Sequence, residues 1–289
     1  MKRILAITLV IALFAGIGSA FAIEAGQARA VIGNDISLEQ KASVYDKFGI
    51  DEGSVKELTV TNSEEREYLE GLVDDHLIGS RSISCVYIET LSEKKGLDVS
   101  VSNINWCSKE MYINALVTAG ISDAKVIVTS PVEVSGTAAL TGIYKAYEDI
   151  TGTKLDDAAK AAGTQELVVT AELAEEIGNY DAVSIVNELK LILDDTVGMS
   201  KEELRAEIKK IAEDYDVTLN DNQIDQIIEL VRSLEGLDDD ELQDRVEKAQ
   251  KWIQSLSKAK DTVKNFGETV KNIISAVGTF FRNLFGGNN

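Results

Sequence analysis

Residues 82–106 read SISCVYIETLSEKKGLDVSVSNINW and carry the strongest strand signal in the chain. The segments 82–91 and 97–106 are rich in β-branched and aromatic residues, and apolar positions alternate with polar ones in both, as in half-buried strands. Between them lie Glu93 to Gly96, which are typical of a turn. We therefore predict that the two segments pair as a β-hairpin.

Strand and helix signals alternate on both sides of this hairpin. Capping signals start helices at Ser37, Asn62 and Ser108, and Gly49 and Gly120 follow the first and last of them. We expect helices at 37–48, 62–76 and 108–119, and further strands at 55–61 and 124–129. From residue 55 onward this order is the split βαβ pattern of a ferredoxin-like sandwich, with the helix at 37–48 as an added element. The predicted fold class is α+β.

After residue 135 the strand signals stop, and apolar residues recur three and four positions apart. Capping boxes begin at Ser200, Asn220 and Asp238, and each precedes an amphipathic run. The second half is therefore expected to be a bundle of short antiparallel helices. The predicted organisation is a signal peptide at 1–22, an α+β domain at 23–152, a helical bundle at 153–257 and an amphipathic C-terminal helix at 258–289.

The first 22 residues predict export. A basic start, Met1 to Arg3, precedes an apolar run at 4–17, and Ala20 to Ala22 form an A-x-A cleavage signal. The alternative is an uncleaved anchor, but this apolar run is shorter than the roughly 20 residues that span a bilayer. We expect cleavage after Ala22 and an extracytoplasmic location, either secreted or at the cell surface.

The charge of the chain limits its partners. Its formal net charge is −20, so it is strongly acidic, and nucleic acid and anionic lipid should be repelled by most of its surface. The exception is the C-terminal segment 258–289, which has more basic than acidic residues. No nucleic-acid partner is expected.

Two cysteines, Cys85 and Cys107, could form a disulfide in an exported protein. In the predicted hairpin Cys107 lies opposite Ser82, so about 10 Å of strand separates the cysteines, beyond the roughly 7 Å Cα limit of a bridge. Their side chains would also point to opposite faces. This register disfavours the disulfide, and a different register would allow it.

A candidate anion site involves Arg81 and the segment Ser135, Gly136 and Thr137. This segment leads from the last predicted strand into a helix rich in small residues, and N–H groups at such a start can bind phosphate or carboxylate. The simpler interpretation, which we favour, is that Ser135 caps the helix. Arg81 could bind an anion through its guanidinium fork or form a structural ion pair, and the ion pair is favoured.

Catalytic and metal motifs are absent from the sequence. His76 is the only histidine, and a histidine at the end of a helix is usually a surface residue. The acidic runs at 156–157, 194–195 and 238–241 do not match an EF-hand loop and are better explained as helix caps and solvated faces. We predict no metal, no cofactor and no catalytic residue.

The C-terminal segment has an apolar seam with strict three- and four-residue spacing, as in a heptad repeat. Its members are Val263, Phe266, Val270, Ile273, Val277, Phe280 and Leu284. Burying them contributes about 1.5 to 3 kcal/mol each, so the seam should not remain in water. It could pack on the acidic body of the chain, on a partner helix or on a membrane interface.

Three segments together resemble the YpuA-like family of exported proteins, a domain of unknown function found in Gram-positive bacteria and some archaea. They are residues 81–89, residues 105–121 and residues 135–148. The resemblance covers about residues 28–234 and implies no reaction, ligand or functional residue.

The sequence therefore favours an exported, non-enzymatic protein of the cell envelope or medium. It would act through an envelope protein or a membrane surface that binds the C-terminal helix. The alternative is an envelope ligand-binding protein or enzyme with an anion site near Arg81 and the helix start at 135–137. A cleft in which Arg81 and Ser135 meet would favour this alternative.

Overall fold

The computed structural model describes residues 24–71, 75–237 and 242–257. Among these residues, the strands form one sheet: Ala28–Gly33 (β1), Lys56–Val60 (β2), Cys85–Thr90 (β3), Leu97–Ile104 (β4) and Ala124–Val134 (β5). The helices of the N-terminal half are Leu38–Phe48 (α1), Asn62–Leu69 (α2), Asp75–Ile78 (α3), Lys109–Thr118 (α4) and Ala139–Thr151 (α5). Those of the second half are Asp157–Ile177 (α6), Asn179–Leu191 (α7), Leu193–Thr196 (α8), Lys201–Glu213 (α9), Asp221–Glu235 (α10) and Leu242–Ser257 (α11).

The sheet has the order β2-β1-β3-β5-β4. Strands β1 and β2 are parallel and α1 connects them, and β4 and β5 are parallel and α4 connects them. Between these two βαβ units, β3 is antiparallel to both β1 and β5. The carboxyl ends of the four parallel-running strands therefore lie at one edge of the sheet, where β3 begins.

The predicted hairpin is wrong, because β5 lies between β3 and β4. The burial of the strands explains this order: β5 buries Ala124, Val126 and Val128 completely, whereas β4 leaves Asp98 and Ser100 exposed. The polar alternation of residues 97–104 is thus typical of an edge strand. The ferredoxin-like arrangement is not confirmed, and strand β1 was not predicted. The α+β class and the helical second half are confirmed.

Local capping signals were the most accurate part of the prediction. Capping boxes start α1 at Ser37, α9 at Ser200 and α10 at Asn220, and Gly49 ends α1 with a left-handed φ of 71°. The cap of α2 is Thr61, one residue before the predicted one, with Glu64 as the reciprocal partner. The helix expected at 62–76 ends at Leu69, and α3 follows it as a separate short helix.

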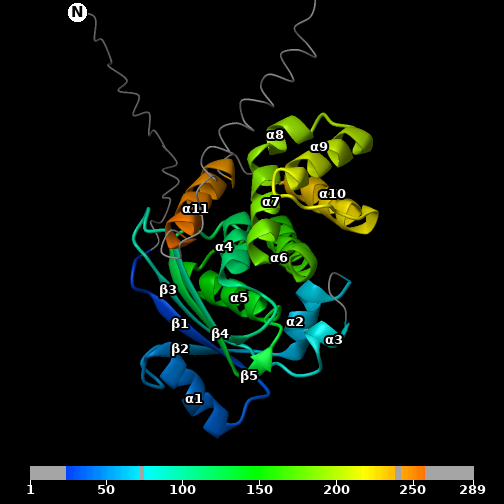
Figure 1. The fold of residues 1–289 in the computed structure, drawn as a ribbon. Helices are drawn as coiled ribbons and strands as arrows, with labels where there is room; N and C mark the ends of the chain where they lie inside the picture. Colours follow the sequence, from blue (N-terminus) through cyan, green and yellow to red (C-terminus); the bar gives the residue numbers. More distant parts are fainter. Residues whose placement is uncertain (1–23, 72–74, 238–241, 258–289) are drawn as a thin grey trace, which may run out of the picture.

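The two faces of the sheet support different cores (Figure 1). Helix α1 covers one face with Val44, Tyr45 and Phe48 against β1 and β3. Helices α4 and α5 cover the other face, and α6, α7 and α11 continue the same core outward from α4. This core is continuous across residue 152.

The two free cysteines belong to opposite faces of the sheet. Cys85 packs with the α1 core and Cys107 with the α4 core, and both are buried. A bridge between them would have to pass through the sheet.

The core of the second half contains a buried ion pair. Lys190 on α7 lies 2.8 Å from Glu166 on α6, and both side chains are fully buried. Thr118 on α4 donates a hydrogen bond to the same carboxylate. Burial lowers the pKa of Lys190 from its usual value, and the contact with Glu166 acts in the opposite direction.

Several expected segments lie outside the described residues. They are the signal peptide at 1–22, the capping box and acidic run at 238–241, and the C-terminal seam from Val263 to Leu284. Within the part that is described, no helix is long and apolar enough to cross a membrane. Helix α11 precedes the seam and buries Leu242, Val246, Gln250 and Ile253.

Candidate ligand-binding cleft

A cleft of about 680 Å³ opens at the edge of the sheet where the parallel strands end. Ligand sites in α/β sheets commonly lie at this edge, and the volume is within the range of small-molecule pockets. Three stretches form most of its lining: residues 78–81 and 83–84 before β3, residues 105–106 after β4, and residues 133–135 at the end of β5. Ala138 and Glu175 complete it.

The stretch Arg81 to Ser84 forms one wall and is attached to the end of β1. The Ser82 N–H donates to Asp35 Oδ2 at 2.7 Å, and the Arg81 guanidinium donates to the Asp35 carbonyl at 2.6 Å. Ser130 Oγ donates to the Ile83 carbonyl. The contact with β1 is close enough to require glycine, because a Cβ at Gly33 would lie 2.4 Å from the Ser82 carbonyl oxygen.

A buried carboxyl lies behind this wall. Glu65 on α2 is completely buried, and Ser82 Oγ is 2.5 Å from its Oε1 while Asn62 donates to its Oε2. Burial raises the pKa of Glu65 to about 7; the hydrogen bonds with Ser82 and Asn62 act against this rise, and the nearby carboxylates of Asp35 and Glu64 add to it.

The rest of the lining includes an indole and carboxylates. Trp106 donates from Nε1 to Glu175 on α6 at 2.7 Å, and this bond orients the ring. Glu133 reaches the cleft through an irregular pairing of β5 with β4: Thr129 lies opposite Ser102, and Val134 lies opposite Ile104. The intervening residues of β5 bulge out of the ladder.

The residues of the predicted anion site separate in the structure. Arg81 and Ser135 line the same cleft, but Gly136 and Thr137 are buried and do not line it. The Gly136 carbonyl accepts a hydrogen bond from Tyr112 at 2.5 Å. The cap of α5 is Ala138 without a side-chain bond, so the prediction that Ser135 caps this helix is wrong.

The charges around the cleft are mixed. Arg81 is the only cation that lines it, and Glu133 and Glu175 are carboxylates, all three on exposed residues of the described chain. Apolar surface comes from Ile78, Ile83 and Val134. A purely anionic ligand does not match this lining, because a phosphate would face two carboxylates and one guanidinium.

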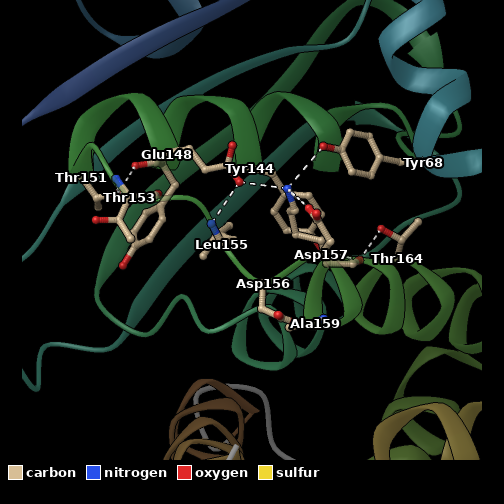
Figure 2. Close-up of polar contacts among 12 residues, drawn as sticks. Tyr68, Tyr144, Glu148, Thr151, Thr153, Leu155, Asp156, Asp157, Ala159 and Thr164 are labelled. Atoms are coloured by element: carbon tan, nitrogen blue, oxygen red, sulfur yellow. Dashed lines mark hydrogen bonds and ion pairs between the residues drawn. The ribbon is translucent and has the colours of Figure 1, made fainter. Parts of the chain in front are cut away.

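Lys160 is another charged side chain with an unusual environment, but it has a structural role; Figure 2 labels its partners Tyr68, Glu148 and Asp157. It is almost fully buried, its ammonium lies 2.9 Å from both Glu148 and Asp157, and it lies 5.5 Å from the centre of the Tyr68 ring. Burial alone would lower its pKa, but the hydrogen bonds to Asp157 and Glu148 raise it above the usual range. These contacts join the start of α6 to α5 and α2.

Among the residues that the structure describes, no group of three or more His, Cys, Asp or Glu side chains could hold a metal ion. Asp156 caps α6 through the Ala159 N–H, and Asp194 and Asp195 lie in the first turn of α8. His76 lies in α3. The run at 238–241 is outside the described part.

Sequence reasoning missed Trp106, Glu133 and Glu175 as residues that line the cleft with Arg81, and Glu65 as the carboxyl behind the wall. A glutamate in the first turn of a helix has the pattern of a solvated residue, and only the packing of α2 behind the wall buries it. Trp106 lies two residues after the end of β4, and its position just beyond a parallel strand is the one signal that could have placed it in a site.

Comparisons with known proteins place the chain among relatives. Residues 32–273 match the family described as "Protein of unknown function (DUF1002)". The chain is 37% identical over 266 residues to the uncharacterized protein YpuA of Bacillus subtilis (strain 168), which covers 90% of this chain and 88% of the relative. No solved structure matches. These descriptions state no activity, so a function has to be argued from the geometry of the cleft.

Proposed function

We propose that this chain, which belongs to the DUF1002 family, is an exported binding protein whose cleft holds a small zwitterion of the amino-acid or short-peptide class. The observation that carries the proposal is the convergence of Arg81, Glu133 and an apolar wall around one cleft of about 680 Å³. The signal-like sequence at 1–22 supports the location.

The lining is complementary to each part of such a ligand. A guanidinium binds a carboxylate through two parallel N–H donors, so Arg81 would bind the terminal carboxylate. Glu133, which lines the same cleft, would accept hydrogen bonds from the ammonium group. Ile78, Ile83 and Val134 would contact the aliphatic side chain. Glu175 is a weaker candidate for the ammonium, because it already accepts from Trp106.

The test compares one dipeptide with two blocked forms. Leu-Leu, N-acetyl-Leu-Leu and Leu-Leu-amide are titrated calorimetrically into the purified protein at pH 6. We expect Leu-Leu to bind and each block to weaken binding about tenfold or more, since each removes one charge-assisted contact of about 1.5 to 3 kcal/mol.

Variants assign the two contacts. The Arg81→Ala variant should bind Leu-Leu more weakly than the wild type does, and it should bind Leu-Leu and Leu-Leu-amide equally. The Glu133→Gln variant should bind Leu-Leu and N-acetyl-Leu-Leu equally. Arg205→Ala on α9 is the matched control, because Arg205 pairs with Asp221 and Asp225 away from the cleft. Equal binding of all three peptides, or no binding of Leu-Leu, would overturn the proposal.

The C-terminal seam favours a second function. Its seven apolar positions, from Val263 to Leu284, and the basic excess of segment 258–289 fit an envelope partner or a membrane surface. Truncation after Ser257 tests this: we expect loss of liposome binding or of co-purifying envelope protein, with an unchanged thermal midpoint. A lower midpoint alone would assign the seam to the body of the chain.

A further inference from the structure

The hydroxyl of Ser82 has one hydrogen to donate but lies within hydrogen-bond distance of two oxygen atoms. Its Oγ is 2.8 Å from the Val60 carbonyl oxygen and 2.5 Å from Glu65 Oε1, and Ser82 is completely buried. A serine hydroxyl has one hydrogen, and a carbonyl can only accept. If Glu65 were ionised, one of these two contacts would join two oxygen atoms with no hydrogen between them.

A protonated Glu65 satisfies every atom of this group. The carboxylic acid donates its hydrogen to Ser82 Oγ, and Ser82 donates its own to the Val60 carbonyl. Asn62 donates to the second carboxyl oxygen. A neutral Glu65 therefore gives each of these contacts a hydrogen of its own.

The charged groups packed around Glu65 support the neutral form. Asp35 and Glu64 are the charged neighbours that act on it, and both disfavour ionisation. The cations of the surrounding elements have other partners: Arg66 of α2 pairs with Asp75 of α3, Lys145 of α5 pairs with Glu64, Lys160 of α6 pairs with Glu148 and Asp157, and Arg81 donates to the Asp35 carbonyl.

We propose that Glu65 is a positioning residue for the cleft: its protonated carboxyl holds Ser82, and ionisation of Glu65 releases the wall from Arg81 to Ser84. Ser82 is the link because it lies between Arg81 and Ile83, which both line the cleft. The burial that raises the pKa of Glu65 to about 7 puts this change near neutral pH. Its effect on affinity rests on the proposed function, whereas the movement of the wall does not.

The first experiment uses the ligand-free protein. The side-chain carboxyl carbon of Glu65 is followed by ¹³C NMR from pH 5 to 9 and assigned by its absence in Glu65→Gln. Amide hydrogen exchange of residues 82–84 is measured in both proteins. Glutamine donates to Ser82 at every pH, so this variant keeps the wall attached and also corrects for the pH dependence of exchange itself.

We expect the Glu65 signal to titrate near pH 7. Exchange at residues 82–84 in the wild type, relative to Glu65→Gln, should rise by up to about tenfold per pH unit above that midpoint. A midpoint below pH 5.5, or equal exchange in the two proteins at every pH, would overturn the proposal.

The second experiment separates this proposal from the proposed function. Leu-Leu is titrated into both proteins from pH 6 to 8.5, and Glu65→Gln reports the titration of the dipeptide's own amino group. We expect the Kd of the wild type to rise by up to about tenfold per pH unit relative to the variant. Binding by both proteins with one pH profile would overturn the role of Glu65 only. Absence of binding at every pH would overturn the proposed function, and the ligand-free data would still decide the role of Glu65.

Discussion

The ion pair between Lys190 and Glu166 gives the sharpest stability prediction. Both side chains are fully buried, the charged atoms are 2.8 Å apart, and Thr118 occupies the second carboxylate oxygen. Lys190→Met removes the cation without removing the volume and leaves Glu166 as an uncompensated buried charge. Losing one partner of a buried pair costs about 3 to 5 kcal/mol, a large part of the roughly 5 to 15 kcal/mol that stabilises a typical domain.

The double variant Glu166→Leu/Lys190→Met separates the net contribution of the ion pair to stability from the cost of leaving one buried charge without a partner. Replacing both partners with apolar groups is often neutral, and the Thr118 hydroxyl can turn to the carbonyl of Asn114 in its own helix. We expect the double variant to be within about 2 kcal/mol of the wild type, and so more stable than Lys190→Met.

Urea unfolding followed by far-ultraviolet circular dichroism measures both differences, with Lys251→Met as the control. Lys251 pairs with Glu247 on the exposed face of α11, and such a pair contributes at most about 1 kcal/mol. If Lys190→Met costs less than about 1 kcal/mol, or if the double variant is less stable than the single one, the described pairing in this core is incorrect.

Three further predictions follow from close contacts and from one shifted pKa. Gly33→Ala should destabilise the chain by about 1 to 3 kcal/mol and weaken Leu-Leu binding, because its Cβ would meet the backbone of Ser82; urea unfolding and calorimetry check the two effects. Gly163→Ala should be destabilising in urea although alanine favours helices by about 1 kcal/mol, because its Cβ would lie 2.6 Å from the Ala115 carbonyl oxygen; a more stable variant would contradict the packing of α6 on α4. The pKa of Glu65 is raised from 4.5 in the unfolded chain to about 7 in the folded one, so folding takes up a proton between these pH values. The protonated Glu65 therefore contributes its full stabilisation of the fold below about pH 4.5, and this stabilisation falls as the pH rises to 7. Glu65→Gln should therefore gain stability relative to the wild type by up to about 1.4 kcal/mol per pH unit between pH 5 and 7, and parallel stability curves would show that the pKa is not raised.

Local signals in the sequence predicted local structure well. The caps at Ser37, Ser200 and Asn220 depend on a side chain and a backbone N–H three residues apart, so the sequence contains both partners. The failures concern pairs that are distant in the chain. Whether residues 97–104 pair with β3 or β5 depends on the return path of α4, and the alternation of residues 97–104 fits both.

The candidate site shows the same difference between local features, which the sequence predicts, and long-range contacts, which it does not. The chemistry of Arg81 and Ser135 identifies them as candidates, and the sheet order determines that both line one cleft. Glu65 could not be identified, because its burial depends on the packing of α2 against the loop before β3. Glu133 faces the cleft only because β5 bulges at its end, and Pro131 alone does not predict the position of such a bulge.

The most direct test of the binding cleft is the indole N–H of Trp106 in an NMR titration with Leu-Leu. The chain has two tryptophans, so Trp252→Phe assigns the Trp106 signal, and the Trp252 signal serves as the internal control. We expect a saturable shift of Trp106 in the wild type, none in Arg81→Ala at the same concentrations, and no shift of Trp252. A dipeptide that binds while the Trp106 signal stays unchanged would contradict the assignment of the site to this cleft.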